Sequence, residues 1–258
     1  MSKHSSSSAG DAALAAIHRS SDRLLTFARS TNETVDSDSL RRLRISTRTL
    51  RSDVRTFAPL LNPVWSESLR ADLAWLGGEL RTSRDLDVTE TRIVAGCGAL
   101  TENDAPAAQR LLATLEVDKS TARIAVVEAL RTERFSLIAD QLGAVNPETI
   151  QRNDEAGLQL WDTPASSVLP GLVSTRWKKL HGAAEKLSVA PTEIELHSLR
   201  LLVKRCRYAA EAARPAVGKD ARQFARALHE FQRHHGEVQD SAATEAGSEL
   251  WQQIEASP

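Results

Sequence analysis

Apolar residues recur along most of the chain at the three- and four-residue spacing of an amphipathic α-helix. The first such run starts at Asp11 and ends near Arg29, and the third starts near Val64 and reaches Leu80. Further helical runs cover residues 40–57, 111–138, 172–187, 196–211, 220–235 and 237–255. Strand signals are nearly absent, because apolar and polar residues rarely alternate and tyrosine occurs once. The pattern predicts an all-α protein.

Local signals mark where these helices begin. Ser37 or Asp38 is expected to cap the second helix. Thr192 and Glu195 stand three residues apart ahead of the helix over 196–211, which is the spacing of a capping box. This capping role gives Glu195 a structural explanation.

Glycine and proline divide the chain. Residues 143–171 contain six of these helix breakers, which makes this segment the expected connection between two halves. The halves, residues 11–142 and 172–258, each hold several helices and short loops, which is typical of helical bundles. Residues 1–10 are Ser-rich and are predicted to be a disordered tail. The segment RTSRDLDVTETRIV either continues the third helix or opens a new one near Asp85.

The second helix carries a row of arginines beside its apolar face. At 100° per residue they fall within about 80° of one another. These residues are Arg41, Arg44, Arg48, Arg51 and Arg55. Neighbouring like charges repel by a few tenths of a kcal/mol per pair, so a row without acidic partners at the same spacing favours a bound anion.

The same pattern returns 156 residues later. The shift places basic residues on Arg41, Arg44, Arg48 and Arg51, namely His197, Arg200, Lys204 and Arg207. It also places three leucines on apolar positions of the second helix, namely Leu196, Leu199 and Leu201. So many matches in one register predict an internal duplication, with a basic helix in each half.

Net charge conceals this segregation. The formal net charge of the chain is −1, yet residues 41–57 carry +5 and residues 197–208 carry +4. The rest of the chain therefore carries −10, so the excess of positive over negative charge is concentrated in these two helices.

Cysteine content and hydropathy bear on the compartment. Cys97 and Cys206 are too few for a disulfide framework and are predicted to be reduced core residues in a reducing compartment. No apolar run reaches the length of a transmembrane helix, and the start of the chain lacks a signal-peptide pattern. Cytoplasmic localisation without a membrane partner is the expectation.

Three motifs together resemble the CHAD family, the conserved-histidine α-helical domain. They are LRRLRISTRTLRSDVRTF, RDLDV at residues 84–88 and LHSLRLLVKRCRYAAE. The resemblance implies two four-helix bundles related by pseudo-two-fold symmetry, with a basic groove or pore between them that binds inorganic polyphosphate. It also implies association with polyphosphate granules and with a polyphosphate-metabolising enzyme, since some family members are fused to a triphosphate-tunnel domain.

One position departs from the family pattern. The family usually places a histidine at the start of both basic helices, and here His197 matches whereas Arg41 does not. Arginine stays charged at every accessible pH, so anion binding is compatible with Arg41 while a proton-linked role is in doubt.

The predicted polyphosphate ligands come from both basic helices and their neighbours. The helices supply Arg41, Arg44, Arg48, Arg51, Arg55, His197, Arg200, Lys204, Arg205, Arg207 and Tyr208. Weaker candidates on adjacent helices, equally compatible with surface positions, are Arg81, Arg84, Lys178, Lys179 and Arg233. Guanidinium groups suit this role because they grip phosphate oxygens in pairs.

No catalytic, cofactor or metal site is predicted. Asp85 and Asp87 are expected to orient arginines or cap a helix rather than act as a catalytic pair. His229 and Glu230 begin a metalloprotease-like string that lacks its second histidine, and the cluster His234, His235 and Glu237 is expected to bind metal only adventitiously. The expected function is non-catalytic binding of polyphosphate.

Two alternatives stay open. One is a helical nucleic-acid-binding protein, although the scarcity of aromatic residues disfavours stacking on single strands. The other is a phosphohydrolase acting on polyphosphate or triphosphate, which would need clustered acids to hold a metal.

Overall fold

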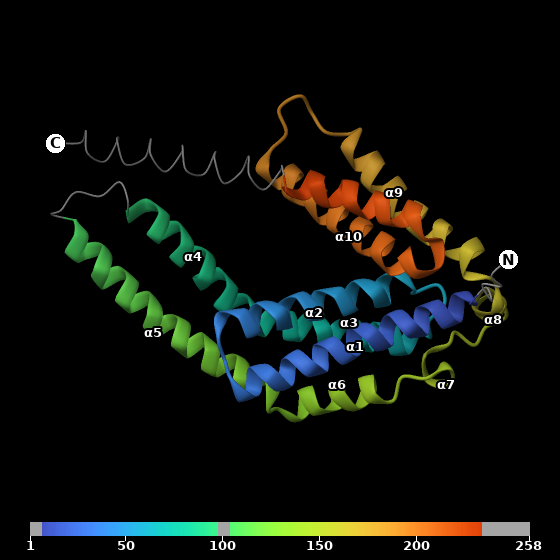
Figure 1. Cartoon of the computed structure of the whole chain (residues 1–258), viewed down its shortest axis with the longest axis horizontal. Coiled ribbons are helices and arrows are strands. Elements are labelled where there is room, and N and C mark those ends of the chain that lie inside the picture. The colour runs from blue at the N-terminus through green and yellow to red at the C-terminus, as the bar shows by residue number, and fades with distance from the viewer. Residues whose placement is uncertain (1–6, 98–103, 234–258) are drawn as a thin grey trace. The chain divides into compact units, whose positions relative to one another are not determined.

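The computed structural model describes residues 7–97 and 104–233 and contains only helices and their connections there. The helices are α1 (Ala9–Glu33), α2 (Ser37–Thr56), α3 (Pro63–Glu79), α4 (Arg81–Cys97), α5 (Ala105–Leu130), α6 (Glu133–Gly143), α7 (Pro147–Ile150), α8 (Glu155–Asp162), α9 (Ala165–Ala184) and α10 (Glu193–Val217) (Figure 1). Residues 219–233 are also helical. The all-α prediction is confirmed. The described residues form two compact units, one of residues 8–163 and one that holds Ser7 and residues 164–233.

Helix α1 begins earlier than the hydrophobic pattern indicates. Ser8 is its N-cap and forms a capping box with Asp11, whose backbone N–H donates to Ser8 Oγ at 3.0 Å. Ala9 and Gly10 are therefore helical, which corrects the predicted tail over residues 1–10; residues 1–6 lie outside the described part. The helix also runs past Arg29 to Glu33.

Helix α2 is capped by Asp36, so the prediction of Ser37 or Asp38 is wrong. Asp36 Oδ1 accepts from the Ser39 N–H at 2.6 Å, and Ser39 Oγ accepts from the Asp36 N–H at 3.1 Å. Asp38 instead forms an ion pair with Arg42, one turn later in the same helix. The predicted capping box of Thr192 and Glu195 at the start of α10 is confirmed.

Acid should weaken both basic helices at these caps. Bonds from Ser39 hold the pKa of Asp36 below its usual 3.8, and bonds from Thr192 hold that of Glu195 below 4.5. Since both pKa values are depressed in the fold, each cap stabilises the protein above its unfolded pKa, and this is lost as pH falls through the folded value. Thermal unfolding at pH 6 and pH 3 measures the loss.

The matched variant for that measurement is Asp36→Asn, because asparagine caps a helix about as well but does not titrate. We expect its melting temperature to fall less between pH 6 and pH 3 than that of the wild type. Equal pH dependence in the two proteins would refute the assignment of Asp36 as a titrating cap.

The first unit is built on α1, α2 and α3. Helix α2 packs against both neighbours, and its apolar face is fully buried. The buried residues of that face include Leu40, Leu43, Leu50 and Val54, and Phe57 follows them. Helix α6 packs against α1 and α3. This core fixes which side of α2 faces solvent.

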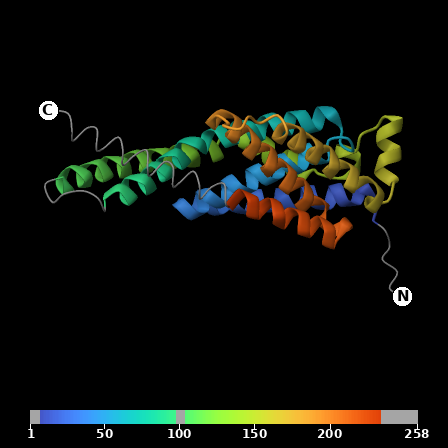
Figure 2. The ribbon, with the colours of Figure 1, turned by 90° about the horizontal axis from the view of Figure 1, so that it is seen from above.

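Helices α4 and α5 pack along each other as a pair (Figure 1 and Figure 2). Ser83 is the one fully buried residue of α4. The position of this helix is therefore held by its packing against α5 and by the contacts of its first turns. The sequence left open whether the segment after Leu80 continues α3. Leu80 interrupts it, and α4 is a new helix that begins at Arg81 rather than near Asp85.

The predicted connection, residues 143–171, is largely helical. It includes α7, α8 and the start of α9, which begins at Ala165 rather than Leu172 and contains Pro170. Ala165 and Leu169 are buried, and this burial offsets the hydrogen bond lost at the proline. In the first unit α8 packs on α1, where a Cβ at Gly10 would lie 2.2 Å from the Trp161 ring.

In the second unit α9 packs against α10, and residues 219–233 complete the described core. Its centre includes Leu180, Val203 and Cys206. Burial raises the pKa of the Cys206 thiol to about 11, although Arg176 opposes the shift. Cys97, predicted as a core residue, is only half-buried at the end of α4. The predicted helix 237–255 lies outside the described residues.

None of the helices in the described ranges is long and apolar enough to cross a membrane. The expected pseudo-two-fold relation between the halves stays a prediction.

Candidate anion-binding faces

Helix α2 carries its arginine row on the side left free by the core. Arg41 and Arg48 are exposed, while Arg44, Arg51 and Arg55 are half-buried. The solvent side of α2 is not purely polar, because Ile45 lies beside the row and is 41% exposed. The buried leucines of α2 therefore hold five guanidinium groups on one helix face.

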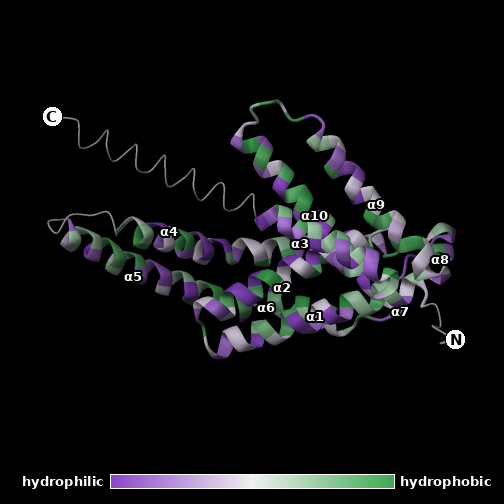
Figure 3. Cartoon of the chain, turned by 45° about the horizontal axis from the view of Figure 1, so that its top comes forward, coloured by the Kyte–Doolittle hydropathy of each residue, from purple (hydrophilic) through white to green (hydrophobic). Residues whose placement is uncertain are grey.

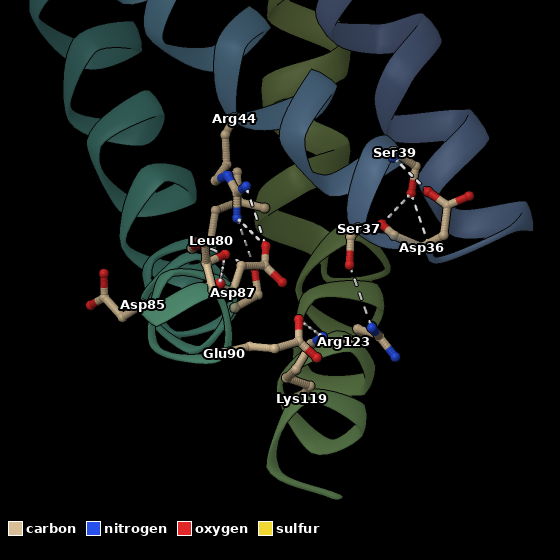
Figure 4. A network of polar contacts seen from close by, with 12 residues as sticks. Asp36, Ser37, Ser39, Arg44, Leu80, Asp85, Asp87, Glu90, Lys119 and Arg123 are labelled. Carbon is tan, nitrogen blue, oxygen red and sulfur yellow. Dashed lines mark hydrogen bonds and ion pairs between the residues drawn. The ribbon is translucent and has the colours of Figure 1, made fainter. Parts of the chain in front are cut away.

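Arg44 is paired with an acid from another helix. Its Nη1 donates to Asp87 Oδ2 at 3.3 Å and to Ser83 Oγ at 3.4 Å, and its Nη2 donates to Asp87 Oδ2 at 3.4 Å (Figure 4). The prediction that an acid of the RDLD segment orients an arginine is confirmed for Asp87. Asp85 points away from Arg44 and is exposed (Figure 4). These contacts join the first turns of α4 to α2.

Arg81 and Arg84 lie on the same first turns of α4 and are both exposed. They belong to the same unit as the arginines of α2, and α4 contacts α2. Their side chains add positive charge to the first turns of α4, the part of the helix from which Asp87 contacts Arg44.

Helix α10 presents the second basic face. His197 and Arg205 are exposed, and Arg200, Lys204 and Arg207 are half-buried. Thus all five basic candidates of α10 have some access to solvent. Leu201, which matches Ile45 in the 156-residue register, is likewise exposed, at 39%.

Arg207 is held by two neighbours on its own helix. Its Nη1 donates to Glu211 Oε1 at 2.8 Å, and its guanidinium carbon lies 4.6 Å from the centre of the Tyr208 ring. Tyr208 is buried, so its ring offers Arg207 a fixed surface to pack on. The expectation of a row without acidic partners at helical spacing is therefore wrong at Arg207, whereas the partner of Arg44 comes from another helix.

Each face also retains a buried guanidinium N–H without an acceptor among the described residues. Arg51 Nε on α2 and Arg207 Nε on α10 are such donors, and these two arginines are equivalent in the duplication. Arg200 Nη1 is a further case. Buried donors are nearly always satisfied in folded proteins, so an acceptor from solvent or a ligand is expected at these atoms. Arg70 Nε on α3, outside both faces, is a buried donor of the same kind.

The remaining candidates lie elsewhere in the second unit. Lys178 and Lys179 are exposed on α9, and Lys178 adjoins Trp177 and His181 in a shallow hollow of that helix. Arg233 is exposed at the end of the described residues and has a polar or charged interaction. None of these three is placed on α10 itself.

Within the described ranges, no group of three or more acids, histidines or cysteines is placed so that it could hold a metal ion. The cluster His234, His235 and Glu237 lies outside those ranges.

Comparison with known proteins identifies the family to which the chain belongs. The family model described as CHAD domain matches residues 15–246. The chain belongs to the CHAD domain family. Polyphosphate binding is the known role of CHAD domains. Among curated proteins, none matches the chain.

Two solved structures share the CHAD fold of this chain. The CHAD domain from the plant Ricinus communis aligns with a TM-score of 0.71 and 23% identity, over 99% of this chain and 83% of that chain. PptA from Streptomyces chartreusis aligns with a TM-score of 0.63 and 22% identity, over 94% of this chain and 99% of that chain. At these identities the likeness establishes the fold.

Proposed function

We propose that this CHAD domain protein binds inorganic polyphosphate, without catalysis, through the basic faces of α2 and α10. The observation that carries the proposal is the pair of equivalent arginines, Arg51 and Arg207, each with a buried Nε that lacks an acceptor among the described residues. Phosphate oxygens are strong acceptors for guanidinium N–H groups. A linear polyanion would supply them along both helices.

The spacing of the cations suits such a ligand. Basic residues recur about once per turn on each helix, and a helical turn rises by about 5.4 Å. Polyphosphate carries negative charge at every unit, so adjacent turns can each contact phosphate oxygens. The groove expected between the bundles stays a prediction that rests on the family resemblance.

In the cell, this binding would direct the protein to polyphosphate granules or bring it to an enzyme that makes or degrades polyphosphate. Incubation of the protein with long-chain polyphosphate and Mg²⁺ or Mn²⁺ tests the non-catalytic part of the proposal. We expect no release of phosphate. Metal-dependent release of phosphate would instead show that the protein is a phosphohydrolase.

Nucleic acid is the competing polyanion. We expect polyphosphate to displace a labelled oligonucleotide at physiological salt, and the oligonucleotide to displace labelled polyphosphate poorly. The reverse order of affinities would favour a nucleic-acid-binding protein.

Asp87 should lower the affinity for polyphosphate, because it occupies Arg44 and adds a negative charge to the face of α2. Replacement by asparagine is therefore expected to tighten binding about two- to fivefold, as an ion pair worth about 0.5 to 1 kcal/mol is removed. The slope of log affinity against log salt should steepen by about 0.7 to 0.9 as one more cation becomes available.

Asp85→Asn is the matched control. It removes the same charge from the same helix, yet the Asp85 side chain is exposed and has no ion pair within the described residues. We expect it to change the affinity less than Asp87→Asn and to leave the salt slope unchanged. Equal effects of the two variants would show that only net charge matters.

A further inference from the structure

Helix α5 has two opposite faces. One packs against the rest of the first unit, and its buried residues are Leu115, Lys119, Ala122, Val126, Ala129 and Leu130. About 150° around the helix lies a second row, spaced by alternate steps of four and three residues. This row, here called the α5 seam, consists of Arg110, Thr114, Val117, Thr121, Ile124 and Glu128.

The α5 seam is exposed along its whole length. Val117 is 66% exposed and Ile124 is 56% exposed. The hydroxyl groups of Thr114 and Thr121 donate to backbone carbonyls one turn earlier, both at 3.1 Å, so their methyl groups are left to form the outer surface. The middle of the seam is therefore apolar, and hydrophobic residues recur along α5 (Figure 3).

The alternation of four and three residues is the repeat by which one helix packs along another. One face of α5 is buried in its own unit, and the opposite seam is exposed and apolar in its middle. Such a helix can pack against a further helix along the exposed seam. The end charges indicate which helix that is.

The α5 seam is complementary to itself when two copies run antiparallel. With position 119 at the centre, Val117 lies opposite Thr121 of a second copy and Thr114 lies opposite Ile124 of that copy. The same register brings Arg110 opposite Glu128 of that copy at both ends. Neither Arg110 nor Glu128 has an ion pair within the described residues. Val117 and Ile124 thus each meet a threonine of the other copy, and opposite charges meet at each end.

We propose that the α5 seam is a homodimer interface in which two copies of α5 pack antiparallel about position 119. In a two-fold interface, if residue i of one copy faces residue j of the other, residue j of the first copy must also face residue i of the other. One register satisfies this condition for all six residues of the seam. The proposal does not depend on polyphosphate binding.

Polar contacts fix α5 within the first unit. Lys119, on the buried face at the centre of the helix, donates to Glu90 Oε2 of α4 at 2.6 Å (Figure 4). Within α5, Arg123 donates to Glu116 Oε1 at 2.8 Å. The seam is therefore presented by a helix that is already ordered, which lowers the entropic cost of association.

Sedimentation velocity of the full-length chain tests the interface. We expect the wild type to shift from monomer toward dimer between about 1 and 100 µM. The double variant Val117→Glu/Ile124→Glu should remain monomeric, with unchanged helix content by circular dichroism. Leu111→Glu, on the same helix at 52% exposure but outside the seam, should dimerise like the wild type.

A charge swap tests the register. Arg110→Glu and Glu128→Arg each place like charges together at both ends and should weaken the dimer about tenfold. The double variant Arg110→Glu/Glu128→Arg should recover wild-type affinity. A wild type that stays monomeric throughout, a seam variant that still dimerises, or a double variant without recovery would each overturn the proposal.

Discussion

Charge reversal at Arg48 and Lys204 together is expected to lower the affinity for long-chain polyphosphate by at least about 100-fold. The two residues occupy equivalent positions on the basic faces of α2 and α10, so the variant weakens both faces at once. A hydrogen bond to a charged group contributes about 1.5 to 3 kcal/mol, and two lost contacts already account for this factor before any repulsion is added. Fluorescence anisotropy with labelled polyphosphate measures it.

The fold should tolerate this change, because Arg48 is exposed and Lys204 is half-buried. Circular dichroism should give wild-type helix content. The control variant Arg23→Glu/Lys186→Glu reverses two exposed charges on neither basic helix and should retain most of the affinity. Wild-type binding by Arg48→Glu/Lys204→Glu would remove these two faces from the site.

Leu50→Ala is expected to give a large loss of stability. Leu50 is fully buried in the middle of α2, between α1 and α3. Truncation of such a leucine leaves a cavity and costs about 2 to 5 kcal/mol, which corresponds to a fall of about 5 to 15 °C in melting temperature. Differential scanning calorimetry measures this fall.

Ile45→Ala provides the comparison on the same helix. Ile45 is 41% exposed beside the arginine row, so its truncation should change the melting temperature by only about 1 to 2 °C. Similar losses for both variants would show that the apolar side of α2 has been misassigned. The contrast tests whether core leucines hold the arginine row in place.

The sequence reveals the two basic helices because their evidence is local. Buried leucines and arginines repeat with the period of the helix, and this period alone separates the core face of α2 from its basic face. The start of the helix is harder to predict, since Asp36, Ser37 and Asp38 are all good N-caps, and the structure shows that the reciprocal capping box with Ser39 forms at Asp36. Packing likewise carries α9 through Pro170, which sequence rules treat as a break.

Contacts between helices could not be read in the same way. The pairing of Arg44 with Asp87 joins residues 43 positions apart, and no local pattern indicates it. In contrast, Glu211 stands four residues after Arg207, so that ion pair could have been inferred from helical spacing. The α5 seam was hidden because helical periodicity in residues 111–138 does not show which of two rows faces the core.

Binding of long-chain polyphosphate across a salt titration tests the central claim most directly. If arginines and lysine of both basic helices grip the chain, the affinity should fall steeply with salt, with a log–log slope of about 3 or more for four or more neutralised phosphates. An affinity that is independent of salt, or absence of binding at low salt, would contradict the assignment of α2 and α10 as a polyphosphate-binding site.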